Sequence, residues 1–130
     1  MKRPLAYICS PIHFSDDQQT KLDMKKAGEY CRILYEAGYT PIAPQMFLPY
    51  YVDTGIAEER QELKQMSLNL LRRCHVFVIC ESEADCAMLE LIQAAHDRHI
   101  TATTLEGLLT ARKLTSEKQS GAPEPHADKT

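Results

Sequence analysis

The feature of this sequence that most limits its fold is a regular alternation of short apolar segments with amphipathic helical ones. Strands are predicted at residues 4–10, 39–44, 75–80 and 100–104, and helices at 16–37, 56–74, 82–99 and 105–114. A strand-helix pair that recurs four times requires parallel strands, joined by right-handed crossovers, with helices on both faces of the sheet. We therefore expect an α/β fold built on a parallel sheet of four to five strands.

Local signals predict the place of individual elements. The run HVFVIC (75–80) is apolar throughout, which is typical of a central strand covered on both faces. Pro41 cannot donate a ladder hydrogen bond, so residues 39–44 favour an edge strand, and Gly38 stands where a helix commonly ends. In the helix at 56–74, the spacing predicts that one face carries Leu63, Met66, Leu70 and Cys74.

Length and composition indicate one globular domain over residues 1–114. The remaining residues, 115–130, are polar and contain Gly121, Pro123 and Pro125, so we expect a disordered tail. A net charge of −3 argues against nucleic acid as a partner, because phosphate neutralisation needs clustered Lys and Arg. The apolar run behind the basic start is of strand length, shorter than a signal peptide or a membrane span requires. We expect a cytoplasmic protein with no membrane partner.

The cysteines favour the same compartment. There are five, at positions 9, 31, 74, 80 and 86, and no two form a CxxC pair. A zinc site from Cys80, Cys86 and a histidine would lack the paired spacing of structural zinc sites. Buried free thiols are the preferred interpretation, and neither a metal nor a cofactor is predicted.

A ligand site is expected where the strands end, because open parallel sheets bind ligands at the carboxyl ends of their strands. The sequence contains neither GxGxxG nor a Walker loop. Four acids follow the third strand: Glu81, Glu83, Asp85 and Glu90. An ionised carboxylate beside a cleft can attack a sugar anomeric carbon while a second carboxyl group assists the leaving group.

Simpler roles remain open for the same residues. Glu83 and Asp85 also suit the first turn of a helix capped by Ser82. Glu90 flanks the apolar stripe of its helix, and periodicity alone favours a solvated side chain there. Tyr7 lies within the first strand, where the alternation predicts a core ring with its hydroxyl near the end of the sheet.

Three segments, YICSPI (7–12), AGYTPIAPQMF (37–47) and CAMLEL (86–91), together resemble the nucleoside 2-deoxyribosyltransferase-like superfamily, and above all its small uncharacterised bacterial and phage members. The likeness in element order covers roughly residues 4–103. It implies a flavodoxin-like three-layer sandwich. It also implies enzymes that cleave the N-glycosidic bond of deoxynucleosides or deoxynucleotides through a glutamate, after which another base or water replaces the first base.

The resemblance also implies site residues. Glu90 would be the nucleophile, and Glu83 or Asp85 would assist the leaving group. The turn Cys9-Ser10-Pro11 would face the nucleotide, and Gln45 would face the base or sugar. Ser10 and Cys86 stand where the superfamily commonly has glycine, which lets a ligand approach the backbone closely. The predicted substrate-binding residues are Tyr7, Ser10, Pro11, Gln45 and Cys86.

Three functions follow as hypotheses. The first is an enzyme that cleaves or transfers a deoxyribosyl group from a small nucleoside or nucleotide. The second is a non-catalytic module of the same fold that binds or senses nucleotides, favoured by the two replaced glycines. The third is an interaction protein whose aromatic loop, residues 45–55, forms an interface between copies of the chain. The predicted assembly is a homo-oligomer, which is compatible with either of the first two.

Overall fold

The computed structural model describes residues 3–13, 16–81 and 86–111, without the side chains of residues 86 and 87. Its elements in chain order are β1 (Leu5–Cys9), α1 (Asp17–Glu36), β2 (Thr40–Ile42), the 3₁₀ turns η1 (Pro44–Met46) and η2 (Leu48–Tyr50), α2 (Ala57–Arg72), β3 (Val76–Ile79), α3 (Cys86–Asp97) and β4 (Thr101–Thr104). A short helical segment, 105–111, follows β4.

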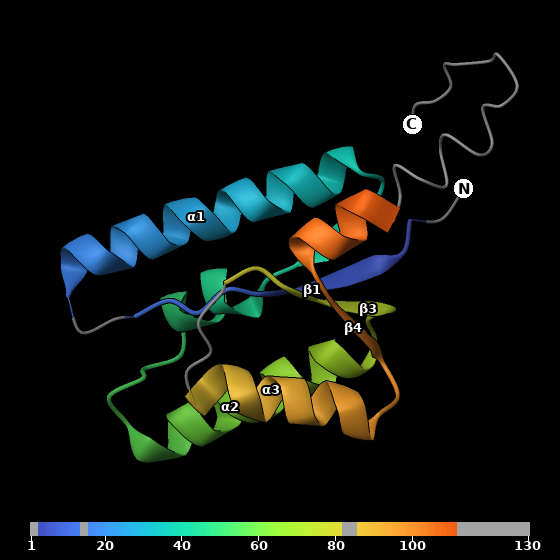
Figure 1. Ribbon diagram of the computed structural model, residues 1–130. Coiled ribbons are helices and arrows are strands. Elements are labelled where there is room, and N and C mark those ends of the chain that lie inside the picture. The colour runs from blue at the N-terminus through green and yellow to red at the C-terminus, as the bar shows by residue number, and fades with distance from the viewer. Residues whose placement is uncertain (1–2, 14–15, 82–85, 112–130) are drawn as a thin grey trace, which may run out of the picture.

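The four strands form one sheet in the order β2-β1-β3-β4, and every neighbouring pair is parallel. Helix α1 and the segment 105–111 cover one face, while α2 and α3 lie side by side on the other (Figure 1). The predicted α/β fold, a flavodoxin-like sandwich with a parallel sheet between two helical layers, is therefore confirmed.

The strands take the positions that their composition predicts. The apolar strands β1 and β3 are central, and β2 is an edge strand in which Pro41 lies opposite Ala6 of β1. An edge position tolerates proline because one side of the strand needs no ladder donor. At the other edge, the largely exposed threonine-rich strand β4 pairs with β3.

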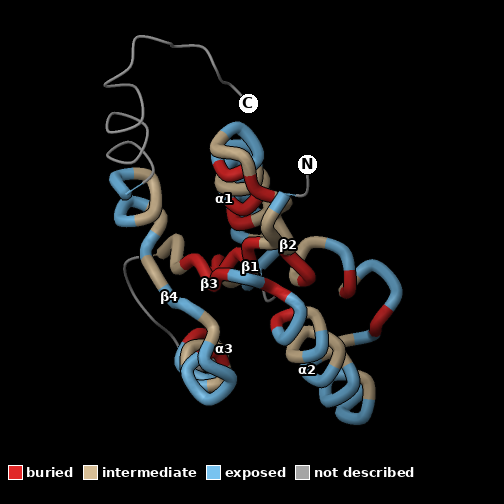
Figure 2. Tube along the Cα trace, turned by 90° about the vertical axis from the view of Figure 1, so that its right-hand side faces the viewer, coloured by how far each residue is buried: buried red, intermediate tan, exposed pale blue. Residues whose placement is uncertain are grey.

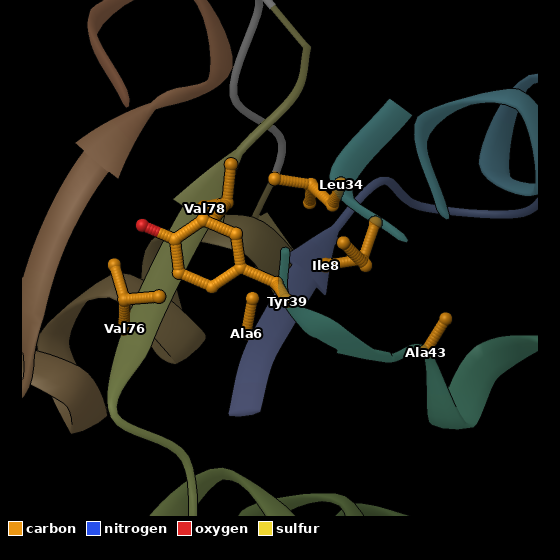
Figure 3. Packing of buried hydrophobic residues seen from close by; sticks show 7 residues of the cluster. All are labelled: Ala6, Ile8, Leu34, Tyr39, Ala43, Val76 and Val78. Atoms are coloured by element: carbon orange, nitrogen blue, oxygen red, sulfur yellow. The ribbon is translucent and has the colours of Figure 1, made fainter. Parts of the chain in front are cut away.

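Alternating side chains of the central strands build one core on each face of the sheet. The core under α1 contains Ala6, Ile8, Leu34, Tyr39, Ala43, Val76 and Val78 (Figure 3). The core under α2 and α3 contains Tyr7, Cys9, Leu71, Cys74, Phe77, Met88 and Ala95. Buried residues accordingly run along β1 and β3 and recur on helices of both layers (Figure 2).

Helix α1 has a defined start and end. The carboxylate of Asp16 accepts a hydrogen bond of 3.2 Å from the backbone N–H of Gln18, which satisfies a donor of the first turn. Two residues after Glu36, Gly38 adopts a positive φ of 99°, a conformation that side-chain-bearing residues rarely adopt. The predicted terminal glycine is thus confirmed, and it turns the chain directly into β2.

Some predictions fall beyond the described residues. They are the tail at 115–130, the helix cap at Ser82 and the acids Glu83 and Asp85. Within the described ranges, no helix combines the length and apolar character needed to cross a membrane.

Candidate functional site

A pocket of about 790 Å³ opens on the α2 and α3 side of the sheet, beside the carboxyl end of β1. This volume lies in the range of small-molecule sites. Three groups of residues form its wall: the end of β1 with the turn that follows, the loop between β2 and α2, and the facing sides of α2 and α3. They are Tyr7, Ile8, Cys9, Ser10, Pro11, Ile12, Gln45, Pro49, Thr54, Ala57, Arg60, Gln61, Leu63, Lys64, Ser67, Leu68, Met88, Glu90, Leu91 and Ala94.

Five predicted site residues meet in this pocket: Tyr7, Ser10, Pro11, Gln45 and Glu90. They come from β1, the turn after it, η1 and α3, so only the folded chain brings them together. Glu83 and Asp85 lie outside the described residues. Cys86 opens α3, but its side chain is not described either.

Tyr7 contributes a neutral phenol to the pocket. Its ring is buried and stacks on Phe77, with 5.6 Å between ring centroids. Burial raises the pKa of Tyr7 far above its ordinary value, although a hydrogen bond with the Ser67 hydroxyl partly opposes the shift. The phenol therefore stays protonated and can serve as a hydrogen-bonding group, but not as a base.

Gln45 fixes the end of β1. Its Nε2 donates to the carbonyl oxygen of Ile8 at 3.0 Å and to that of Ser10 at 2.9 Å. Both amide hydrogens are thus used on the backbone, and the side-chain oxygen remains as the atom that can accept a hydrogen bond from a ligand.

Ser10 lines the pocket, but its side chain is directed to another partner. The residue is 2% exposed, and its hydroxyl donates to Oε2 of Glu81 at 3.3 Å. Tyr30 of α1 donates to the same oxygen at 3.2 Å, and Lys26 lies 4.0 Å from Oε1. Burial, and then the charge of Glu81, raises the pKa of Tyr30 to about 12. Glu81 is thus the centre of a polar cluster that ties α1 to the ends of β1 and β3.

Glu90 lies on α3 at the rim of the pocket. Its side chain is 59% exposed, and its Oε1 lies 2.8 Å from Nζ of Lys64 on α2. The exposure agrees with the flanking position that the helical periodicity predicts. What periodicity did not show is that this exposed flank borders the pocket and faces a cation on the neighbouring helix.

The polar residues of α2 were missed by the sequence prediction. On the predicted face, Leu63, Met66 and Leu70 are half-buried and Cys74 is buried, so α2 is amphipathic as predicted. A second series on α2 runs from Arg60, Lys64 and Ser67, which line the pocket, to Leu71 and Cys74, which are buried in the core. Its second half is apolar and packs in the core, whereas its first half is polar and lines the pocket. The sequence did contain a signal for these pocket residues. Arg60, Lys64 and Ser67 follow i, i+4, i+7 spacing, and the same spacing continues to the core residues Leu71 and Cys74.

The turn after β1 is held by Asp23 of α1. Oδ2 of this buried carboxylate accepts from the backbone N–H of His13 at 2.9 Å and lies 3.0 Å from its ring Nδ1. Oδ1 accepts from Gln19 at 2.8 Å. Burial alone would raise the pKa of Asp23, but these hydrogen bonds outweigh it and lower the pKa below its usual value.

We predict that Asp23→Asn destabilises the protein at neutral pH and that the difference shrinks in acid. A depressed folded-state pKa stabilises the fold above the ordinary value of 3.8, and that stabilisation is lost as the pH falls through the folded-state pKa. Urea unfolding of both proteins between pH 7 and pH 2.5 measures the difference. A gap that stays constant across this range would contradict the role given to the Asp23 carboxylate.

Cys31, Cys74 and Cys80 are thiols that burial keeps from acting as activated nucleophiles. Burial raises the pKa of Cys74 to about 11 and that of Cys80 to about 12, so both stay protonated near neutral pH. In the ranges that the structure covers, no three His, Cys, Asp or Glu side chains are grouped to hold a metal ion.

Comparison with known proteins identifies the family. A search of curated proteins gives no match to this chain. The family model described as "Domain of unknown function (DUF7768)" matches residues 4–105, which include all four strands and every residue of the pocket. The chain therefore belongs to the DUF7768 domain family.

Proposed function

We propose that the pocket binds a small nucleoside or nucleotide and that Glu90 cleaves its N-glycosidic bond. The observation that carries this proposal is the presence of Glu90, Tyr7 and Gln45 on the wall of one pocket of about 790 Å³. The resemblance of three segments to the nucleoside 2-deoxyribosyltransferase-like superfamily supports the same assignment.

In the proposed reaction, an oxygen of Glu90 attacks C1′ of the sugar. The bond between C1′ and the base nitrogen breaks, and the base leaves with the bonding electrons and takes up a proton. Water or a second base then attacks C1′ and releases the carboxylate, so the sugar is hydrolysed or transferred. Glu83 and Asp85 stay the predicted sources of the proton for the leaving base.

A mixture of deoxynucleosides and their 5′-monophosphates, incubated with the protein, tests the proposal. Chromatography should detect free base from at least one substrate. If none of the eight common deoxynucleosides and deoxynucleotides releases base, the catalytic proposal is rejected.

A non-catalytic nucleotide-binding module is the second candidate. The ion pair of 2.8 Å between Lys64 and Glu90 favours it, because a carboxylate held by a cation is a weaker nucleophile than a free one. Calorimetry with the same compounds separates the two functions, since this candidate binds a nucleotide without releasing its base.

We also propose that the protein forms a homo-oligomer in the cytoplasm. Phe47, Tyr50 and Tyr51 lie in the aromatic loop and are all exposed, Tyr50 at 80%. Exposed aromatic side chains are enriched at protein interfaces, and the free thiols fit a reducing compartment. Light scattering measures the molar mass of the wild type and of the double variant Tyr50→Ser/Tyr51→Ser in solution. The double variant should have the smaller mass. Equal masses would exclude this loop as the interface.

A further inference from the structure

We infer that Arg60 and Lys64 on α2 form an anion site within the pocket, and that the ligand is a nucleoside 5′-monophosphate rather than a free nucleoside. This inference rests on the proposed function, because it names the substrate class of the same pocket. It assigns specificity to two residues that the sequence prediction did not include.

The charges of the pocket carry the first step. Its charged lining residues are Arg60, Lys64 and Glu90, so the wall holds two cations and one anion. If Glu90 forms an ester with C1′, its charge disappears and Lys64 loses the counter-ion that now lies 2.8 Å away. In this intermediate the esterified Glu90 carries no negative charge, so it cannot balance the two cations of the pocket wall. A phosphate on the ligand would supply the missing negative charge.

The position of Arg60 carries the second step. Its Nη1 donates to the backbone oxygen of Thr54 at 2.9 Å, which braces the guanidinium against the loop that also lines the pocket. Within the described part of the chain, Arg60 makes no ion pair with a carboxylate. The hydrogen bond to Thr54 holds the guanidinium at the pocket and leaves its other N–H groups able to donate. A guanidinium can donate to two phosphate oxygens at the same time.

The spacing on α2 carries the third step. Arg60 and Lys64 are four residues apart, slightly more than one helical turn, or about 6 Å along the axis. That separation is comparable to the span of a sugar ring with its exocyclic carbon. A ligand whose C1′ meets Glu90 beside Lys64 can therefore place a phosphate on the far side of its sugar near Arg60.

Calorimetry with matched pairs tests the inference: each common deoxynucleoside and its 5′-monophosphate, titrated into wild type, Arg60→Gln and Arg73→Gln. Arg73 is an exposed cation just after the end of α2 and outside the pocket, so it is the matched control. We expect wild type and Arg73→Gln to bind one monophosphate at least about 10-fold more tightly than its nucleoside, which is the scale of one charge-assisted contact. Arg60→Gln should remove most of this preference and change the nucleoside affinity by less than about twofold.

Equal wild-type affinities for both members of every pair would overturn the inference, as would a preference that survives Arg60→Gln. Both results leave the proposed function intact if a nucleoside is cleaved. The reverse outcome, a preference that depends on Arg60 without any base release, overturns the catalytic proposal and supports the anion site. Absence of binding to every compound would overturn both.

Discussion

Glu90→Gln is expected to abolish base release, by at least about 10³-fold, while the protein still binds its ligand. The amide keeps the size of the side chain but cannot act as an anionic nucleophile toward C1′. The ion pair with Lys64 is also lost, yet both side chains are more than half exposed, so the fold should tolerate the change. Initial rates of base release, followed by chromatography, measure the effect.

Glu62→Gln is the matched control for this experiment. Glu62 is an exposed glutamate on α2 that does not line the pocket, so its variant should keep the wild-type rate. A Glu90→Gln protein that retains more than about a tenth of the activity would rule out Glu90 as the nucleophile.

Phe77→Ala is expected to give the largest loss of stability, about 3–5 kcal/mol. Phe77 is completely buried at the centre of β3, where it stacks on Tyr7 and packs under α2 and α3. The substitution leaves a cavity that the surrounding strands cannot fill. It also removes the ring that supports Tyr7 at the base of the pocket, so ligand affinity should fall together with stability.

Equilibrium unfolding in urea measures this change, with Leu22→Ala as the control. Leu22 is an apolar residue on α1 that is 57% exposed, so its removal should cost less than about 1 kcal/mol. If the two variants had similar unfolding free energies, the packing assigned to the core under α2 and α3 would be wrong.

The fold was predictable from sequence because burial leaves a periodic trace. The apolar run at 75–80 indicated the central strand β3, and Pro41 indicated the edge strand β2. Gly38 indicated the end of α1, which its positive φ confirms. Each signal reports a local constraint that the chain satisfies in the folded state.

The residues of the site were predictable only in part. Hydrophobic periodicity identifies the side chains that pack in the core, but it does not identify polar side chains that line a pocket. The pocket side of α2 includes Arg60, Lys64 and Ser67, which a search for apolar spacing does not select. Pairing of Lys64 with Glu90 depends on the packing of α2 beside α3, which no local pattern encodes.

The serine after β1 has a structural role that the resemblance did not imply. Where the superfamily commonly has glycine, the Ser10 hydroxyl binds Glu81 on the α1 side of the sheet. The backbone of this turn is at the same time held by Gln45. The side chain thus occupies a site of its own in the Glu81 cluster, so serine at this position is compatible with a ligand in the pocket.

The most direct test of the central claim, that Glu90 attacks C1′ of a bound nucleotide, is to trap the covalent intermediate. A deoxynucleotide analogue with fluorine at C2′ withdraws electrons from C1′ and slows turnover of the glycosyl-enzyme, so the adduct should accumulate. Mass spectrometry of the intact protein and of its peptides should then show one sugar adduct, located on Glu90 and absent from Glu90→Gln. An adduct on another residue, or base release from the natural substrate by Glu90→Gln at the wild-type rate, would contradict the claim.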